Sequence, residues 1–261
     1  MEIIFLLVSL FASTIGAICG IGGGVITKPI LDSLNHPSLQ AAEVSFLSSI
    51  SVFSMALFSV SSALRSKEKL IDVKVSLPMA LGAAAGGLLG KILFHALLGA
   101  KNPQHVSLVQ AAILVLMTIG TFFYALYQKK IPSFKVSHVV SCFLTGFGLG
   151  MVSSFLGIGG GPINIAVLGF LFSMNPKVGA QNSLYIILFS QFFSILYTIL
   201  SHNTPDIQWA YPLIMIAGGL LGGVLGKRIN KMLDVEGVRK LFLAADILVI
   251  LLSVYNIVIR F

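Results

Sequence analysis

Hydrophobic residues run along this chain in eight long stretches that are separated by short polar or charged connections. Each stretch reaches the roughly 20 residues that a helix needs to cross a bilayer. The pattern therefore predicts an all-α membrane protein with about eight transmembrane helices. The stretches cover approximately residues 2–33, 40–64, 72–97, 105–128, 136–173, 178–201, 207–230 and 237–260.

The first and fifth stretches are too long for one straight crossing, and both contain the same glycine-rich pentapeptide. Gly20-Ile21-Gly22-Gly23-Gly24 in the first recurs as Gly157-Ile158-Gly159-Gly160-Gly161 in the fifth. Glycine lets a helix unwind where a side chain could not follow. We predict that both helices are broken at these motifs. Length alone leaves open whether each break continues the crossing or turns back as a re-entrant hairpin.

Further matches relate the two parts of the chain, and they predict two homologous four-helix halves. The first transmembrane repeat covers 1–128, a basic linker covers 129–136, and the second repeat covers 137–261. The matching pairs are Ala42-Glu43-Val44-Ser45 with Ala180-Gln181-Asn182-Ser183, and Gly86-Gly87-Leu88-Leu89-Gly90-Lys91 with Gly222-Gly223-Val224-Leu225-Gly226-Lys227.

Composition supports a multi-pass integral membrane protein. Charged residues are 10% of the chain, against about 25% for an ordinary soluble domain, and the mean hydropathy is +0.97. The net charge of +8 comes mostly from short loops. It favours contact with anionic lipid and requires no nucleic-acid partner. The two cysteines, Cys19 and Cys142, are expected to be free thiols.

The orientation of the protein in the membrane can be predicted from its basic loops, but the prediction depends on how many times the chain crosses. With eight single crossings, loops 65–74 and 129–135 share one side and loop 227–240 lies on the other. The positive-inside rule is then nearly balanced, and we favour cytoplasmic termini.

The two breaks are the best candidates for a binding site. A half-helix that starts after a break presents free backbone N–H groups and the positive end of a helix dipole, which together favour an anion. The predicted donors are Gly22, Gly23, Gly24 and Val25 in one half and Gly159, Gly160 and Gly161 in the other. The alternative is that these glycines only allow tight packing. Packing motifs use spaced glycines instead, as at 82, 86 and 90 and at 218, 222 and 226.

Polar residues that open the second and sixth stretches could complete the shell of hydrogen bonds around an anion. The candidates are Ser45, Gln181, Asn182 and Ser183, with Asn164 added because it follows the second motif closely. Capping of helix starts or contacts between helices would explain the same residues. Gln191, deeper in the sixth stretch, has the same two explanations.

Three charged residues could have a coupling or charge role. Asp246 lies well inside the eighth stretch, where a carboxylate costs at least ~2.5 kcal/mol, so it should face a partner or a cavity. Either cation coupling or a hydrogen bond between helices would explain it. Glu43 is near a helix start and could be solvated. Lys28 could pair with Asp32, add positive charge near the first break or extend to the membrane interface. Lys91 and Lys227 are expected to extend to the interface.

The chain has no pattern typical of an enzyme. Its five histidines show no metal-ligand spacing, and neither G-x-S-x-G nor G-x-G-x-x-G occurs. We expect a protein that is not an enzyme, with no cofactor and no metal.

The run from Gly20 to Leu31 resembles the first signature of the TauE/SafE sulfite-exporter family, a glycine cluster followed after four residues by proline and an aliphatic pair. The second pentapeptide resembles the second signature of that family. The resemblance implies an inner-membrane permease for sulfite, thiosulfate or organosulfonates. The chain departs from the pattern at Ala166, where proline is expected, and at Lys28, in a usually apolar stretch.

Our leading hypothesis is a secondary transporter that moves a small sulfur-containing anion by alternating access. One alternative is a cation-coupled or cation-selective carrier that uses Asp246 and Glu43. Another is a non-transporting membrane scaffold or sensor. The expected partners are the small anionic substrate and the lipid bilayer. A coupling ion such as H⁺ or Na⁺ and a homodimer are left open.

Overall fold

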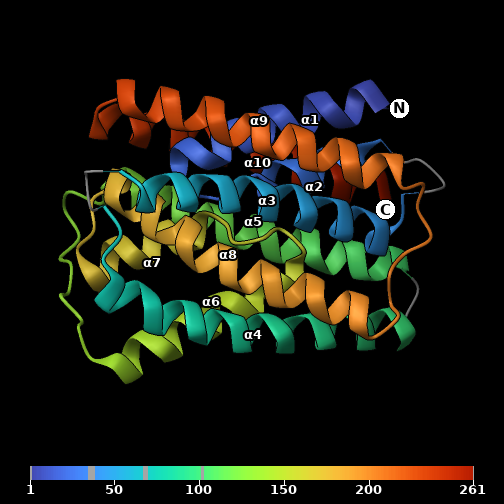
Figure 1. Cartoon of the computed structure of the whole chain (residues 1–261), viewed down its shortest axis with the longest axis horizontal. Helices are drawn as coiled ribbons and strands as arrows, with labels where there is room; N and C mark the ends of the chain where they lie inside the picture. Colours follow the sequence, from blue (N-terminus) through green and yellow to red (C-terminus); the bar gives the residue numbers. More distant parts are fainter. Residues whose placement is uncertain (1, 35–38, 67–69, 101–102, 261) are drawn as a thin grey trace.

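The computed structural model describes residues 2–34, 39–66, 70–100 and 103–260, which form ten α-helices and no strand (Figure 1). Eight of these helices are long and apolar enough to cross a membrane, which confirms an all-α multi-span membrane protein. The helices are α1 (Glu2–Cys19), α2 (Gly24–Ser33), α3 (Ala41–Leu64), α4 (Val73–Ala100), α5 (Pro103–Tyr127), α6 (Val139–Leu156), α7 (Pro162–Phe172), α8 (Pro176–Leu200), α9 (Ala210–Met232) and α10 (Val235–Arg260).

The first predicted segment is broken at its glycine motif, and the chain turns back there. A Cβ atom on Gly23 would lie 2.9 Å from the backbone of Ser13, ten residues earlier. A continuous helix would separate these residues by about 15 Å. Gly20 and Gly22 adopt φ values of +73° and +72°, which only glycine adopts readily. The α1–α2 segment is therefore a re-entrant hairpin.

The fifth predicted segment forms a second hairpin. Backbone N–H groups of Phe134 and Val136, which precede α6, donate to the carbonyls of Phe170 and Leu171 at the end of α7, at 2.7 and 2.9 Å. The end of α7 thus returns to the face where α6 begins. Gly157 and Gly159 have φ values of +65° and +71°, close to those of Gly20 and Gly22.

The two halves have inverted topology. Each half consists of one hairpin followed by three long helices, and an odd number of crossings reverses the direction of the second half. The first helix of each half packs parallel to the middle long helix of the other half. Positions 9, 13 and 17 of α1 face glycines 218, 222 and 226 of α9 in the same order, and glycines 82, 86 and 90 of α4 face α6 similarly. The spaced glycines are confirmed as packing faces. The predicted repeat bounds stay a prediction.

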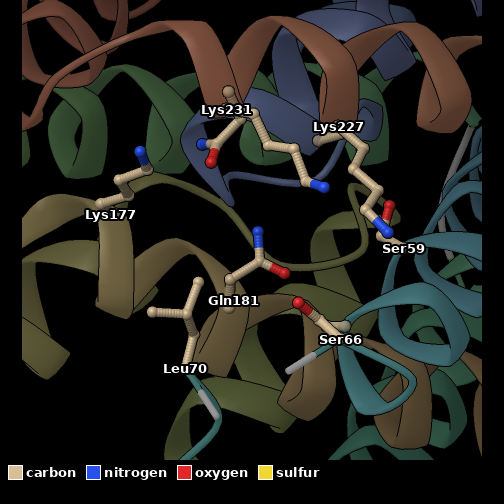
Figure 2. A pocket seen from close by; sticks show the side chains of 10 residues that line it. Ser59, Ser66, Leu70, Lys177, Gln181, Lys227 and Lys231 are labelled. Atoms are coloured by element: carbon tan, nitrogen blue, oxygen red, sulfur yellow. The ribbon is translucent and has the colours of Figure 1, made fainter. Parts of the chain in front are cut away.

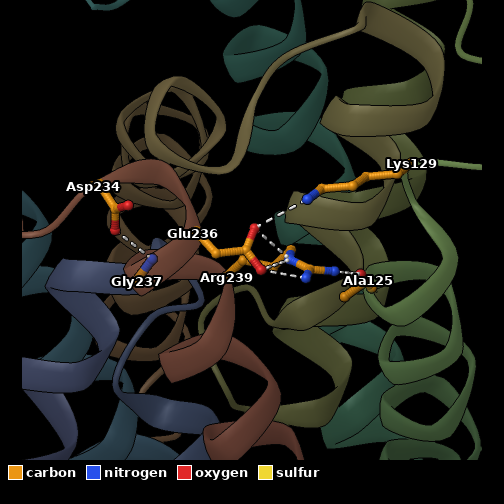
Figure 3. Close-up of polar contacts among 6 residues, drawn as sticks. All are labelled: Ala125, Lys129, Asp234, Glu236, Gly237 and Arg239. Atoms are coloured by element: carbon orange, nitrogen blue, oxygen red, sulfur yellow. Dashed lines mark hydrogen bonds and ion pairs between the residues drawn. The ribbon is translucent and has the colours of Figure 1, made fainter.

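Three basic connections lie together at one end of the bundle, which we call the basic face. It is formed by the α3–α4, α5–α6 and α9–α10 connections. Lys129 lies 3.5 Å from Glu236, which also pairs with Arg239, and Arg239 donates to the Ala125 carbonyl at 3.1 Å (Figure 3). Both termini lie at the opposite end (Figure 1). The split of basic loops expected from eight single crossings is wrong, because the two hairpins return to the faces where they began.

The two breaks lie in the buried interior. Ile21, Val25, Ile26 and Ile158 belong to one hydrophobic cluster, and each is at most 1% exposed. Both cysteines are buried free thiols, as expected. The unwound backbone is therefore enclosed by protein, as irregular structure at membrane depth requires.

The glycine face of α4 provides a direct test of this packing. A Cβ on Gly86 would overlap the Phe147 carbonyl, whereas a Cβ on Gly148, on the partner helix α6, would meet nothing within 4 Å. We expect Gly86→Ala to lower the free energy of unfolding by about 1–3 kcal/mol. Gly148→Ala should leave it unchanged or raise it by up to about 1 kcal/mol, because alanine favours helix. Thermal unfolding in detergent measures both, and equal effects would contradict the parallel α4–α6 contact.

Candidate functional site

The glycine breaks of the two halves meet at the centre of the protein. A Cβ on Gly22 would lie 3.0 Å from the Gly159 carbonyl oxygen, and a Cβ on Gly24 would overlap the Ile158 carbonyl. The Ile187 side chain of α8 reaches both breaks, since it lies 3.5 Å from the same position on Gly22 and also contacts that of Gly160. Peptide groups from both halves therefore form one buried surface.

Most of the predicted backbone donors at the breaks have no acceptor. In the described part of the chain, the amides of Gly22, Gly23, Gly24, Gly159, Gly160 and Gly161 donate no hydrogen bond. Val25 differs from the prediction, because its N–H donates to the Gly22 carbonyl at 3.4 Å. Gly23 already has helical dihedrals, with φ −59° and ψ −21°. The first turn of α2 therefore begins before Val25, and the Val25 N–H is used within that turn. Buried amides without acceptors are costly unless a ligand or water meets them.

Ser45 and Ser183 each contact the break of the opposite half. A Cβ on Gly157 would lie 2.7 Å from the Ser45 Cβ. The Ser183 hydroxyl donates to the Gly20 carbonyl at 2.6 Å. Ser45 of α3 and Ser183 of α8 therefore lie against the breaks, each against the break of the other half.

Lys28 supplies a buried cation next to Ser45. Its side chain is only 3% exposed, and its Nζ donates to the Ser45 hydroxyl at 3.3 Å. The predicted pairing with Asp32 is present at 3.8 Å. Extension of Lys28 to the membrane interface is excluded by this burial. Positive charge thus lies close to the second break, partly balanced by a carboxylate.

Two buried side-chain amides near the breaks have unsatisfied polar atoms. Asn164 is 2% exposed, its oxygen has no partner, and its Nδ2 lies 3.4 Å from the position of a Cβ on Gly160. Gln191 is fully buried with neither polar atom bonded, and it follows Ile187 by one helical turn on α8. An unpaired buried polar group costs about 1–3 kcal/mol. The Gln191 nitrogen is therefore free to donate to a ligand, although sequence left the role of Gln191 undecided, and at Asn164 the nitrogen beside Gly160 is the group that could donate to an anion.

The side chains of Asn182 and Gln181 have surroundings other than the breaks. The Asn182 oxygen accepts from the Asp72 amide at 2.8 Å and the Ser76 hydroxyl at 2.6 Å. Its nitrogen donates to the carbonyls of Leu70 and Val178 at 2.9 and 2.7 Å. The amide is satisfied within the chain, so we leave it out of the proposed site. Gln181 lines a separate cavity at the basic face.

The carboxylates have different surroundings. Glu43 accepts from the Gln40 amide at 2.9 Å and so caps α3. Asp246 is fully buried between α10 and α5, where one oxygen accepts from the Thr121 hydroxyl at 3.4 Å and the other has no partner. The Glu43 carboxylate has a structural role, whereas Asp246 keeps one oxygen available.

Lys91 is a second buried cation, and its expected extension to the interface is wrong. It is 2% exposed, with Nζ 4.8 Å from the centre of the Phe94 ring. The helix continues nine residues beyond it to Ala100, about 14 Å at 1.5 Å per residue, so the ammonium cannot reach the surface. The hydrophobic pattern placed the end of this stretch near residue 97, and the structure extends the helix to Ala100, which moves Lys91 further from the helix end.

Comparison with known proteins agrees with the sequence resemblance. A family model described as "Sulfite exporter TauE/SafE" matches residues 5–253 of the chain. The "Probable membrane transporter protein YunE" of Bacillus subtilis (strain 168) is 25% identical over 254 residues, a match that covers 90% of each chain. No solved structure matches the chain significantly.

The family match spans nearly the whole chain and includes both glycine breaks. It confirms the predicted family and agrees with the expectation of a protein that is not an enzyme. The chain belongs to the TauE/SafE sulfite exporter family and is a multi-pass membrane transporter.

Proposed function

We propose that this transporter moves a small sulfur-containing oxoanion, such as sulfite, thiosulfate or an organosulfonate, which binds between the two glycine breaks. The observation that carries the proposal is the contact between the breaks, where buried amides from both halves have no acceptor. The family description, a sulfite exporter, supports sulfur as the central atom of the anion.

The physical chemistry of the breaks favours an anion held with modest affinity. Backbone N–H groups and the positive ends of α2 and α7 attract negative charge without a fixed cation at the contact point. Lys28 adds charge near Ser45, but Asp32 balances it at 3.8 Å. Asn164 and Gln191 can donate to further oxygens. Moderate binding matters because a transported ion must also leave.

Inverted halves that meet at the site provide a route for alternating access. In such transporters, one repeat rocks against the other around a site near the membrane midplane. Here the peptide groups of both halves contact each other, so relative movement of the halves would open the site to one face at a time. The sequence has no ATP-binding motif, so an ion or substrate gradient would supply the energy.

The surroundings of Asp246 favour a second proposal, that transport is coupled to a cation. A fully buried carboxylate with one unpartnered oxygen can take up a proton or contribute to a Na⁺ site. Glu43 does not share this role, since it caps α3.

A matched pair of asparagine variants tests the anion site. Asn164→Ala should leave thermal stability unchanged or raised, because it removes an unsatisfied amide, and should lower sulfite or thiosulfate flux in proteoliposomes by at least about tenfold, equivalent to one strong hydrogen bond. Asn182→Ala should lower stability by about 1–3 kcal/mol, because its four hydrogen bonds are lost. Thermal shift measures the stability of each purified variant, alone and in the presence of sulfite, thiosulfate, sulfate, isethionate, taurine or phosphate. Normal flux through Asn164→Ala would refute the site.

Coupling is tested at Asp246. Asp246→Asn should keep the thermal shift with sulfite but lose about tenfold or more of the flux driven by a proton or Na⁺ gradient, because the amide takes up no proton and has no negative charge to attract Na⁺. Thr121→Val is the control, since it removes the hydrogen bond to Asp246 and keeps the carboxylate. Coupled flux that survives in Asp246→Asn would exclude this role.

A further inference from the structure

A cavity of about 310 Å³ opens at the basic face, separate from the two breaks. Three lysines line it, together with the amides of Gln181 and Asn230 (Figure 2). Among the residues that the structure describes, no carboxylate lines the cavity; residues 67–69, next to its lining, lie outside the described part. Figure 2 shows Lys227, Lys231 and Gln181 pointing into the same space. The surface of this cavity is therefore strongly positive and rich in hydrogen-bond donors.

The cations of the cavity are held by neutral oxygens. Lys177 donates to the Leu233 carbonyl at 3.0 Å, and Lys227 donates to the Ser62 carbonyl at 3.2 Å and to the Ser62 hydroxyl. Lys231 is exposed at the mouth. By contrast, Lys129 and Arg239 on the same face are paired with Glu236 (Figure 3). The positive charge inside the cavity is thus left for a ligand.

The inner wall of the cavity adjoins the first break. Ala17 lines the cavity three residues before Gly20. Gln181 follows Ala180, and the Ala180 backbone is so close that a Cβ on Gly20 would overlap it. Asn230 donates to the Ile18 carbonyl at 2.7 Å. The same short segment of chain therefore forms the inner wall of the cavity and the beginning of the break.

The basic face carries most of the cationic residues of the chain. Among the described side chains, no lysine or arginine lies at the opposite face, where Glu2 and Asp206 are found; Lys28 and Lys91 are buried. Lys67, Lys69, Lys101 and the side chain of Arg260 fall outside the described residues. The remaining described cations are at the basic face: Arg65, Lys74, Lys129, Lys130, Lys135, Lys177, Lys227, Arg228, Lys231, Arg239 and Lys240.

We propose that the basic face is cytoplasmic and that its cavity is a second anion site, at the cytoplasmic mouth of the transport path. This inference rests on the proposed anion transport. An excess of lysine and arginine marks cytoplasmic connections. Both termini are then extracytoplasmic, contrary to the orientation favoured from eight single crossings. The ligand is a free small oxoanion, which the cavity concentrates beside the first break.

Single cysteines test the orientation, because Cys19 and Cys142 are buried. Ser133→Cys lies on the basic face and Thr204→Cys on the α8–α9 connection at the opposite face, and both positions are exposed. A membrane-impermeant maleimide on intact cells should label Thr204→Cys at once, and Ser133→Cys only after permeabilisation. The reverse pattern would overturn the proposal.

Flux into vesicles of known sidedness tests the anion site. In inside-out vesicles the Lys227→Gln/Lys231→Gln variant should raise the half-saturating sulfite concentration about five- to tenfold, as expected for two cations close to an anion in a wet cavity. Right-side-out vesicles should show less than a twofold change. The control is Lys135→Gln/Lys240→Gln, which removes the same charge from exposed positions outside the cavity. An equal effect of both double variants, or no effect of either, would overturn the site.

Vesicle lipid and the break variant separate the remaining explanations. The effect of Lys227→Gln/Lys231→Gln should persist in vesicles made only of zwitterionic lipid. An effect seen only with anionic lipid would mean that the cavity holds a lipid phosphate, and the proposal fails. Asn164→Ala should reduce flux from both sides of the membrane. If Asn164→Ala is normal while the lysine variant is impaired from one side, the proposed central site fails and the cavity stands.

Discussion

A peptide group inside a bilayer must find its hydrogen-bond partner in the protein, in enclosed water or in a ligand, because lipid offers none. This chain breaks two helices at membrane depth and therefore has to enclose the freed amides. It does so by bringing the breaks into contact with each other, so that residues of one half cover the unwound backbone of the other. The fold of both halves, their inversion and the candidate site all depend on that enclosure.

Glycine serves two purposes here, and its spacing distinguishes them. The consecutive glycines at the breaks adopt positive φ values and allow the chain to reverse. The glycines spaced by four on α4 and α9 stay helical and let α6 and α1 approach until backbones touch. The second use supports the first, because α1 and α6 are the helices that lead into the breaks. Each half thus holds the hairpin of the other in place.

The inverted topology also decides at which end of the protein the basic connections lie. Each hairpin returns to the face where it began. The connections therefore fall on other faces of the protein than they would in a chain of eight simple crossings. The basic connections collect at one end, and a cavity with lysines held by neutral oxygens opens among them. At the centre, by contrast, Lys28 is accompanied by Asp32. The protein therefore presents a strongly positive surface at one mouth and a more nearly balanced one at the breaks.

The sequence by itself determined the fold class, the position of both breaks, the glycine packing faces and the family, because each depends on local composition and spacing. It also pointed to Ser45 and Ser183, which occupy matched positions in the two halves, and to Asn164, which follows the second motif closely. Only the tertiary structure decided that the breaks are hairpins, that Asn182 is satisfied by α4 and its preceding loop, and that Gln191 and Lys91 are buried. Those facts depend on which segments distant along the chain meet in space, and a single sequence does not record the direction in which a glycine lets the chain turn.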